Sequence, residues 1–267
     1  MAAVRMVLDR MEFGQADGAG TPATDTPRTA APGAAEPVAE VRGVSRPYDF
    51  ADIDSVYFIA PNLCPDEPGL VAQALTAARD AGVHRFVYHS VAWPHCPSMP
   101  HHMDKAASED LVRRSGLDWT ILQPCAYLQN FSSVLNGEAT CITLPYSPAS
   151  RFSFIDLADV AEIAATVLLD DSGRHRCASY ELGGPEQLSV DDLARACTMT
   201  HRRPVDIRTS TVQEWNLDQG TGLSDAEKAR LGQMFRHYDV HGFCVGSQIT
   251  QHLLGRAPAT LADLLER

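Results

Sequence analysis

Two short apolar runs joined by a helical segment constrain the fold of this chain more than any other feature. The first run is Arg85–Val91 and the second is Trp119–Pro124. Between them, a loop rich in Pro and His leads into a helical segment that begins near His101 and ends at Gly116. A strand, a helix and a strand in this order form a βαβ unit. Its polar residues lie at the strand ends, where open parallel sheets bind their ligands.

Further segments extend this unit in both directions. The short, continuously apolar run Ser55–Ala60 is typical of a strand buried on both faces of a parallel sheet. The other expected elements are an edge strand at Val38–Val44, strands at Arg151–Ile155 and Tyr180–Leu182, a hairpin at Thr140–Leu144, and helices at Gly69–Gly82, Val160–Leu169, Val190–Thr198 and most of Ser224–Arg267. Asp156 or Asp159, and Ser189, are expected to cap helices. The alternation of strands and helices predicts an α/β fold, a Rossmann-like parallel sheet flanked by helices.

Composition along the chain predicts three regions. Residues 1–13 suit one short strand or helix, whereas residues 14–37 are rich in Gly, Ala, Thr and Pro and show no hydrophobic period. We therefore expect residues 1–37 to be largely irregular or poorly ordered. Residues 38–170 form the expected Rossmann-like core. Residues 171–267 form a smaller, mostly helical substrate or cap region, which returns one strand to the core near residues 180–182.

Charge and cysteine content exclude several classes of function. The formal net charge is −12, from 34 acidic and 22 basic residues, which would repel nucleic acids and anionic membranes. No uninterrupted apolar stretch is long enough to predict a membrane span. The seven cysteines show no C-x-x-C spacing, which favours reduced thiols and a cytoplasmic protein.

The order of motifs resembles the NmrA-like family of atypical short-chain dehydrogenase/reductases. The matching stretches are VYFIAPN, AGVHRFVYHS, HHMDKAASEDLVRRSGLDWTILQPCAYLQNF, FSFIDLADVAEIAA, YELGGPEQLS and the tail MFRHYDVHGFCVG…LLGRAPATLADLL. The resemblance implies a Rossmann-type domain with a small C-terminal substrate domain. It also implies NADP or NAD as cofactor. Some members reduce quinones, imines or phenylpropanoids, and others only sense the nucleotide.

The chain departs from the family at its amino-terminal end. The family begins with a strand and a G-x-x-G-x-x-G loop whose backbone N–H groups hold the pyrophosphate. Here Gly14, Gly18 and Gly20 have a different spacing and run into Thr21-Pro22. We therefore expect an amino-terminal βαβ unit that is truncated or degenerate, and no bound cofactor, with NADP or NAD as the family alternative.

The residues that best suggest chemistry are His101, Lys105 and Ser90. His101 and Lys105 are four apart and share one helix face. Their spacing resembles the Tyr-x-x-x-Lys pair of short-chain dehydrogenases, with His in place of Tyr. A His of ordinary pKa would exchange protons near neutrality while the ammonium holds an oxyanion. Alternatively, Lys105 pairs with Glu109 on a solvated face and His101 lies in the loop. Ser90 either donates to a substrate carbonyl or caps a loop amide.

Other residues are expected around the same crevice. The predicted substrate pocket comprises Trp93, His102, Pro124, Cys125, Tyr127 and Tyr238. If a nucleotide binds, its predicted contacts are Pro61, Asn62, Ser90, Lys105 and Pro124. A metal site is not expected, because His95, Cys96, His101 and His102 fit no standard zinc spacing.

Together these features predict a small-molecule enzyme, and the family resemblance implies a role in secondary metabolism. Because the glycine loop is missing, we expect cyclisation, isomerisation or dehydration by acid–base chemistry, without a firmly bound nicotinamide. The substrate is expected to be aromatic or oxygenated, and a homodimer is possible. The alternatives are an NAD(P)H-dependent oxidoreductase of the NmrA-like family and a non-catalytic regulator that senses a metabolite.

Overall fold

The computed structural model describes residues 4–7, 39–41 and 48–267. In this part of the chain, a parallel β-sheet flanked by helices is the central element. The sheet has six strands in the order β2-β1-β3-β4-β5-β7, and every neighbouring pair is parallel. The strands are β1 (Val4–Val7), β2 (Ala39–Val41), β3 (Ser55–Ile59), β4 (Arg85–His89), β5 (Asp118–Pro124) and β7 (Ala178–Leu182). The expected Rossmann-like sheet is therefore confirmed.

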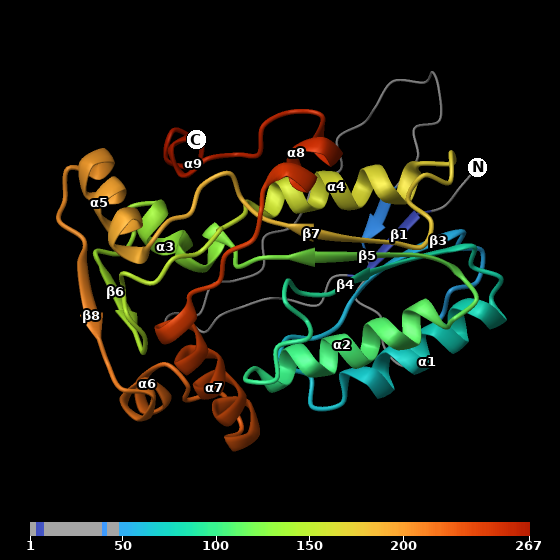
Figure 1. Ribbon diagram of the computed structural model, residues 1–267, viewed down its shortest axis with the longest axis horizontal. Helices are drawn as coiled ribbons and strands as arrows, with labels where there is room; N and C mark the ends of the chain where they lie inside the picture. Colours follow the sequence, from blue (N-terminus) through green and yellow to red (C-terminus); the bar gives the residue numbers. More distant parts are fainter. Residues whose placement is uncertain (1–3, 8–38, 42–47) are drawn as a thin grey trace, which may run out of the picture.

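The central strands are buried on both faces, as their continuous apolar sequences predict. Side chains alternate along each strand, so Val56 and Phe58 of β3 face one layer while Tyr57 and Ile59 face the other. Helices α1 (Glu67–Asp80) and α2 (Pro100–Arg113) cover the first face, and α4 (Leu157–Leu169) covers the second, with α8 (Gln248–Leu254) packed beside it (Figure 1).

A smaller layer lies beyond the end of the sheet at which the strands finish (Figure 1). Its elements are η1 (Leu128–Phe131), α3 (Ser132–Leu135), β6 (Cys141–Leu144), α5 (Val190–His201), β8 (Asp206–Thr209), α6 (Val212–Asp218), α7 (Asp225–His241) and α9 (Leu261–Leu265). We call this layer the cap. Its apolar core joins residues from η1, α3, α5, α6 and α7. The cap therefore sits next to the carboxyl edge of the sheet.

Two expected elements differ in the structure. The segment 140–144 does not form a hairpin: β6 pairs in parallel with β8, more than 60 residues away. The segment 151–155 is not a strand of a sheet, because only Phe152 and Ile155 form isolated bridges. Phe152 and Phe154 instead pack into the cap core.

The expected segment boundaries agree with the structure only in part. The edge strand β2 is present, and β1 is the short strand that residues 1–13 allowed. The segment 8–38, with its glycines, lies outside the described residues. Because β6 precedes residue 170 and pairs with β8, the cap draws on both sides of that expected boundary. None of the described helices combines the length and apolar character that crossing a bilayer requires.

Candidate active site

The carboxyl edge of the sheet brings together most of the residues predicted from the sequence. Pro61 and Asn62 directly follow β3, Ser90 follows β4, and Pro124 ends β5. A backbone hydrogen bond joins the residue after β4 to strand β5, because Ser90 N donates to Leu122 O at 2.8 Å. Strands β3, β4 and β5 are neighbours, so these residues share one edge.

Lys105 reaches this edge from helix α2. Its ammonium forms an ion pair with Oε1 of Glu67 at 2.6 Å and donates to the backbone oxygen of His89, the last residue of β4, at 3.1 Å. Only 16% of the Lys105 side chain is exposed, so the expected alternative of a solvated pair with Glu109 does not occur. The helix spacing places Lys105 correctly, but its partner comes from a different helix.

Glu109 is fully buried beneath the same edge, and it is the centre of a second polar cluster. Its Oε1 accepts from the Ser90 hydroxyl at 2.5 Å and from Nε2 of Gln123 at 2.7 Å. Its Oε2 accepts from Arg113 at 2.7 Å. The Ser90 hydroxyl therefore donates to the Glu109 carboxylate, an acceptor that the sequence did not suggest. Its expected contact with a substrate carbonyl stays a prediction.

His101 and His102 lie in the first turn of α2, not in the loop, and their rings meet edge to face at 4.5 Å. Burial, assisted by the neighbouring charges of His102, Lys105 and Arg230, lowers the pKa of His101 to about 3. Burial lowers the pKa of His102 to about 4 although Trp93 O accepts its hydrogen bond. Both rings are neutral at pH 7, so His101 lacks the ordinary pKa that we expected. Within residues 48–267, its buried Nδ1 has no hydrogen-bond partner.

Trp93 occupies the loop after β4 with an unusual backbone. Its φ of +54° lies in the left-handed region, which is costly for a bulky residue and is often found at functional sites. His102 Nδ1 at 3.0 Å from Trp93 O fixes the carbonyl. The indole meets the rings of Phe243 at 5.1 Å and His237 at 6.0 Å. Trp93 thus joins the core edge to the cap, which is consistent with its predicted place in a substrate pocket.

The three remaining predicted pocket residues are deeply buried. Cys125 donates its thiol to Phe243 O at 3.3 Å, and burial raises the pKa of this thiol to about 12. Tyr238 is 8% exposed and packs against Phe152 in the cap core. Tyr127 is also 8% exposed and bonds to His89. These positions favour packing, and the predicted substrate contacts remain predictions.

Several polar residues of the site were missed from the sequence. Glu67, Tyr57, His89, Gln123 and His237 all make buried or half-buried polar contacts near the carboxyl edge. His89 carried the clearest signal, because a histidine ends an otherwise apolar strand. The partners of the others come from distant segments, which local spacing does not reveal.

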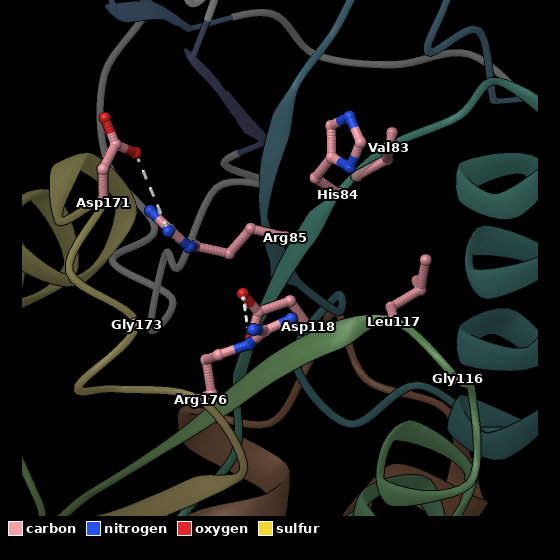
Figure 2. Close-up of a pocket in the computed structure, with 9 residues that line it drawn as sticks. All are labelled: Val83, His84, Arg85, Gly116, Leu117, Asp118, Asp171, Gly173 and Arg176. Atoms are coloured by element: carbon pink, nitrogen blue, oxygen red, sulfur yellow. Dashed lines mark ion pairs between the residues drawn. The ribbon is translucent and has the colours of Figure 1, made fainter.

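The opposite, amino edge of the sheet carries a cleft of different character (Figure 2). Figure 2 shows Arg85 reaching toward Asp171 and Arg176 toward Asp118, with nitrogen–oxygen distances of 3.9 and 3.1 Å. Both pairs have a partner that is at least 65% exposed, where ion pairs are weak. The lining contains none of the predicted site residues, so we place the candidate site at the carboxyl edge. Within residues 48–267, no group of three His, Cys, Asp or Glu residues is arranged to hold a metal ion.

Comparison with known proteins gives three kinds of match. Residues 66–241 match the model of the NmrA-like family. The chain is 29% identical over 172 residues to the NAD(P)H azoreductase of Xenophilus azovorans, covering 63% of this chain and 58% of that protein. It is 27% identical over 158 residues to the agroclavine dehydrogenase of Claviceps fusiformis, covering 55% of this chain and 50% of that protein. The matches thus span between half and three fifths of the length of these two relatives.

Solved structures share the fold. The NADPH-dependent quinone oxidoreductase of Escherichia coli, in complex with NADPH, superposes with a TM-score of 0.72 at 18% identity, covering 85% of this chain and 83% of that chain. The triphenylmethane reductase of Citrobacter sp., in complex with NADP(H), gives 0.70 at 21% identity, covering 85% and 83%.

These comparisons correct the expected function. Non-redox cyclisation, isomerisation or dehydration is wrong as the main hypothesis, because the relatives are a reductase and a dehydrogenase. They favour the alternative, an NAD(P)H-dependent oxidoreductase. The expectation of no cofactor is likewise unsupported, since two of the matching structures hold NADPH or NADP(H). The expectation of no cofactor rested on the spacing of Gly14, Gly18 and Gly20, and these residues lie outside the described part of the chain.

Proposed function

Because the chain belongs to the NmrA-like family, we propose that it is an NAD(P)H-dependent oxidoreductase that reduces a small, flat, conjugated molecule. The relatives named above reduce azo compounds, quinones and triphenylmethane dyes according to their names, which supports this substrate class. The carboxyl edge beside Lys105 is the proposed reaction site.

The strand order fits a dinucleotide. In open parallel sheets the nucleotide lies beyond the carboxyl ends of the strands, at the point where the strand order reverses. Here β1 lies between β2 and β3, so the chain passes from β1 to β2 on one side and then returns to β3 on the other. Pro61 and Asn62 follow β3 at this reversal point and would lie against the nucleotide.

Lys105 is the observation that carries the proposal. Its ammonium has three N–H donors, and two of them are engaged, one by Glu67 and one by the backbone oxygen of His89. A remaining N–H can donate to an oxygen of the nucleotide or the substrate. A bound reduced nicotinamide would supply the hydride. The fixed positive charge of Lys105 would stabilise the negative charge that develops on the reduced acceptor. The neutral ring of His101 would act as a hydrogen-bonding group and not as a cationic acid.

The test combines binding and turnover. NADPH and NADH are titrated by calorimetry, and their oxidation is followed with a small quinone, an azo dye and a triphenylmethane dye as acceptors. Lysine occurs in the sequence only at positions 105 and 228, so Lys228→Met is a matched control for Lys105→Met. We expect Lys105→Met to lower kcat/KM roughly 100-fold or more, while Lys228→Met keeps the wild-type value.

Three outcomes would overturn the proposal. They are a wild-type protein that binds neither nucleotide, one that binds nucleotide and reduces none of the acceptors, and a Lys105→Met variant as active as the control. The second outcome would favour a nucleotide-sensing regulator.

A further inference from the structure

We propose that Glu67 is a positioning residue, which holds the ammonium of Lys105 in place at the carboxyl end of β4. This inference rests on the proposed function, because it concerns the same reduction. Glu67 itself acts through Lys105 and is not proposed to touch the substrate.

The local sequence explains why Glu67 is fixed. Helix α1 begins at Glu67, and the preceding Asp66 caps it by accepting from Gly69 N at 3.0 Å. Gly69 has no Cβ, and a Cβ there would lie 2.1 Å from the Asp66 carboxylate. The stretch Asp66–Gly69 therefore specifies the helix start closely. The positive end of the helix dipole also favours a carboxylate in this first turn.

The contacts of Glu67 converge on one point. Its Oε1 lies 2.6 Å from Lys105 Nζ and accepts from the Tyr88 hydroxyl at 2.5 Å. The ammonium lies 5.3 Å from the centre of the Tyr88 ring and donates to the backbone oxygen of His89. The ammonium of α2 is thus held by groups from α1 and β4. Three separate elements determine its position.

The burial of this pair needs an explanation beyond stability. The exposed fractions of the Lys105 and Glu67 side chains are 16% and 6%. Removing two charges from water costs about as much as their attraction returns, and well-packed apolar pairs are often equally stable. The chain also uses Arg at 20 of its 22 basic positions, because lysine occurs only twice. A compact ammonium with rotatable donors fits the carboxylate oxygen of Glu67 and the backbone oxygen of His89 better than a planar guanidinium does.

A positioning role predicts a specific kinetic effect. A displacement of about 1 Å at a group that contacts the reacting atoms costs roughly 100-fold in rate. The amide of Glu67→Gln keeps the size of the side chain and a hydrogen-bond acceptor for Tyr88, but lacks the charge that holds the ammonium. We expect kcat to fall roughly 10- to 100-fold, with KM for the acceptor within about twofold of wild type.

The experiment uses the full chain and two readouts. The first compares kcat and KM for wild type, Glu67→Gln and Asp110→Asn, a control that makes the same carboxylate-to-amide change at an exposed residue paired with Arg114. The second is carbon NMR of protein labelled at the lysine ε-carbons, which gives two lysine signals, assigned with Lys228→Arg. We expect the Lys105 signal to move in Glu67→Gln, and the Lys228 signal to stay in place. Asp110→Asn should leave both kcat and the Lys105 signal as in wild type.

The outcomes separate this inference from its premise. An unchanged kcat together with an unmoved Lys105 signal in folded Glu67→Gln would overturn the positioning role. A lower unfolding midpoint with unchanged kcat and NMR signal would show that Glu67 is merely structural, and would also overturn it. If the wild-type protein oxidises no nicotinamide, the proposed function fails, while the NMR comparison still reports whether Glu67 fixes Lys105.

Discussion

Two adjacent residues of β4 lead to two different polar networks on opposite faces of the sheet. Tyr88 faces helices α1 and α2 and joins Lys105 and Glu67, which we call the charged network. His89 points to the opposite face and joins Tyr57 and Tyr127, which we call the neutral network. Successive side chains of a strand alternate in this way.

The neutral network is closed. The Tyr57 hydroxyl bonds to Nδ1 of His89, and the Tyr127 hydroxyl lies 2.7 Å from Nε2. Burial, assisted by the charge of Lys105, lowers the pKa of His89 to about 3, and burial raises the pKa of both tyrosines. The three side chains are therefore uncharged at pH 7, and both ring nitrogens have a partner.

The neutral and the charged network therefore suit different tasks. A closed, neutral network has both ring nitrogens occupied, and it fixes β3, β4 and the segment after β5 to one another. A charged network with a donor to spare can act on a bound molecule. The two meet at His89, whose backbone oxygen accepts from Lys105. The predictions below test whether the division between them is real.

The largest effect on stability is expected from the charged network. Lys105→Met leaves the Glu67 carboxylate buried without its cation, which costs about 3 kcal/mol of unfolding free energy. The double variant Lys105→Met/Glu67→Gln removes the charge as well and should regain most of this loss. Urea unfolding at neutral pH measures both values.

The surface supplies the control for this prediction. Arg114 and Asp110 form an i,i+4 pair with side chains 68% and 59% exposed. Arg114→Met should cost less than about 0.5 kcal/mol, because water screens such pairs. A double variant as unstable as Lys105→Met alone would show that buried charge does not distinguish the charged network.

A smaller effect for each side chain is expected from acid, and it acts on the neutral rings. His89 and His101 have folded-state pKa values of about 3, against 6.5 for an unperturbed histidine. As the pH falls below 6.5, the unfolded chain binds protons before the folded protein does. The unfolding free energy therefore decreases between pH 6.5 and 3, by about 2 kcal/mol for each ring at pH 5.

A matched pair of variants isolates one ring. His101→Phe removes a buried imidazole, so it should lose about 2 kcal/mol less than wild type between pH 7 and pH 5. The exposed His252 gives the control, because His252→Phe should follow the wild-type curve. Parallel curves for wild type and His101→Phe would mean that the ring titrates in the folded state much as it does in water.

The strands and caps of the fold were predictable because their signals are local. The apolar runs of β3, β4 and β5 can be read directly, and Ser189 and Asp156 cap their helices through residues two or three positions away. The pairing of β6 with β8 was not predictable, because the two strands lie over 60 residues apart in the sequence. The segment 151–155 has the composition of a strand, but its aromatic side chains pack into the cap instead.

The candidate site was likewise predictable only where its signals are local. Helical spacing placed His101 and Lys105 together near the carboxyl edge, and it suggested Glu109 as the partner of Lys105. The real partner, Glu67, depends on the packing of α1 against α2. The pKa of His101 depends on burial, which spacing does not report.

The smallest effect is expected from the neutral network itself. Tyr57→Phe removes the hydroxyl that pairs with Nδ1 of His89 and leaves a buried ring nitrogen unsatisfied, which costs about 1–2 kcal/mol. Tyr127→Phe does the same at Nε2 and serves as the matched variant. Neither change touches the ammonium of Lys105, so kcat with NADPH should stay within about twofold of wild type, since no catalytic contact is lost. Urea unfolding and steady-state kinetics on the same samples measure both effects. If Tyr57→Phe lowers kcat as much as Glu67→Gln does, the neutral network takes part in the reaction, and the division between the two faces of β4 does not hold.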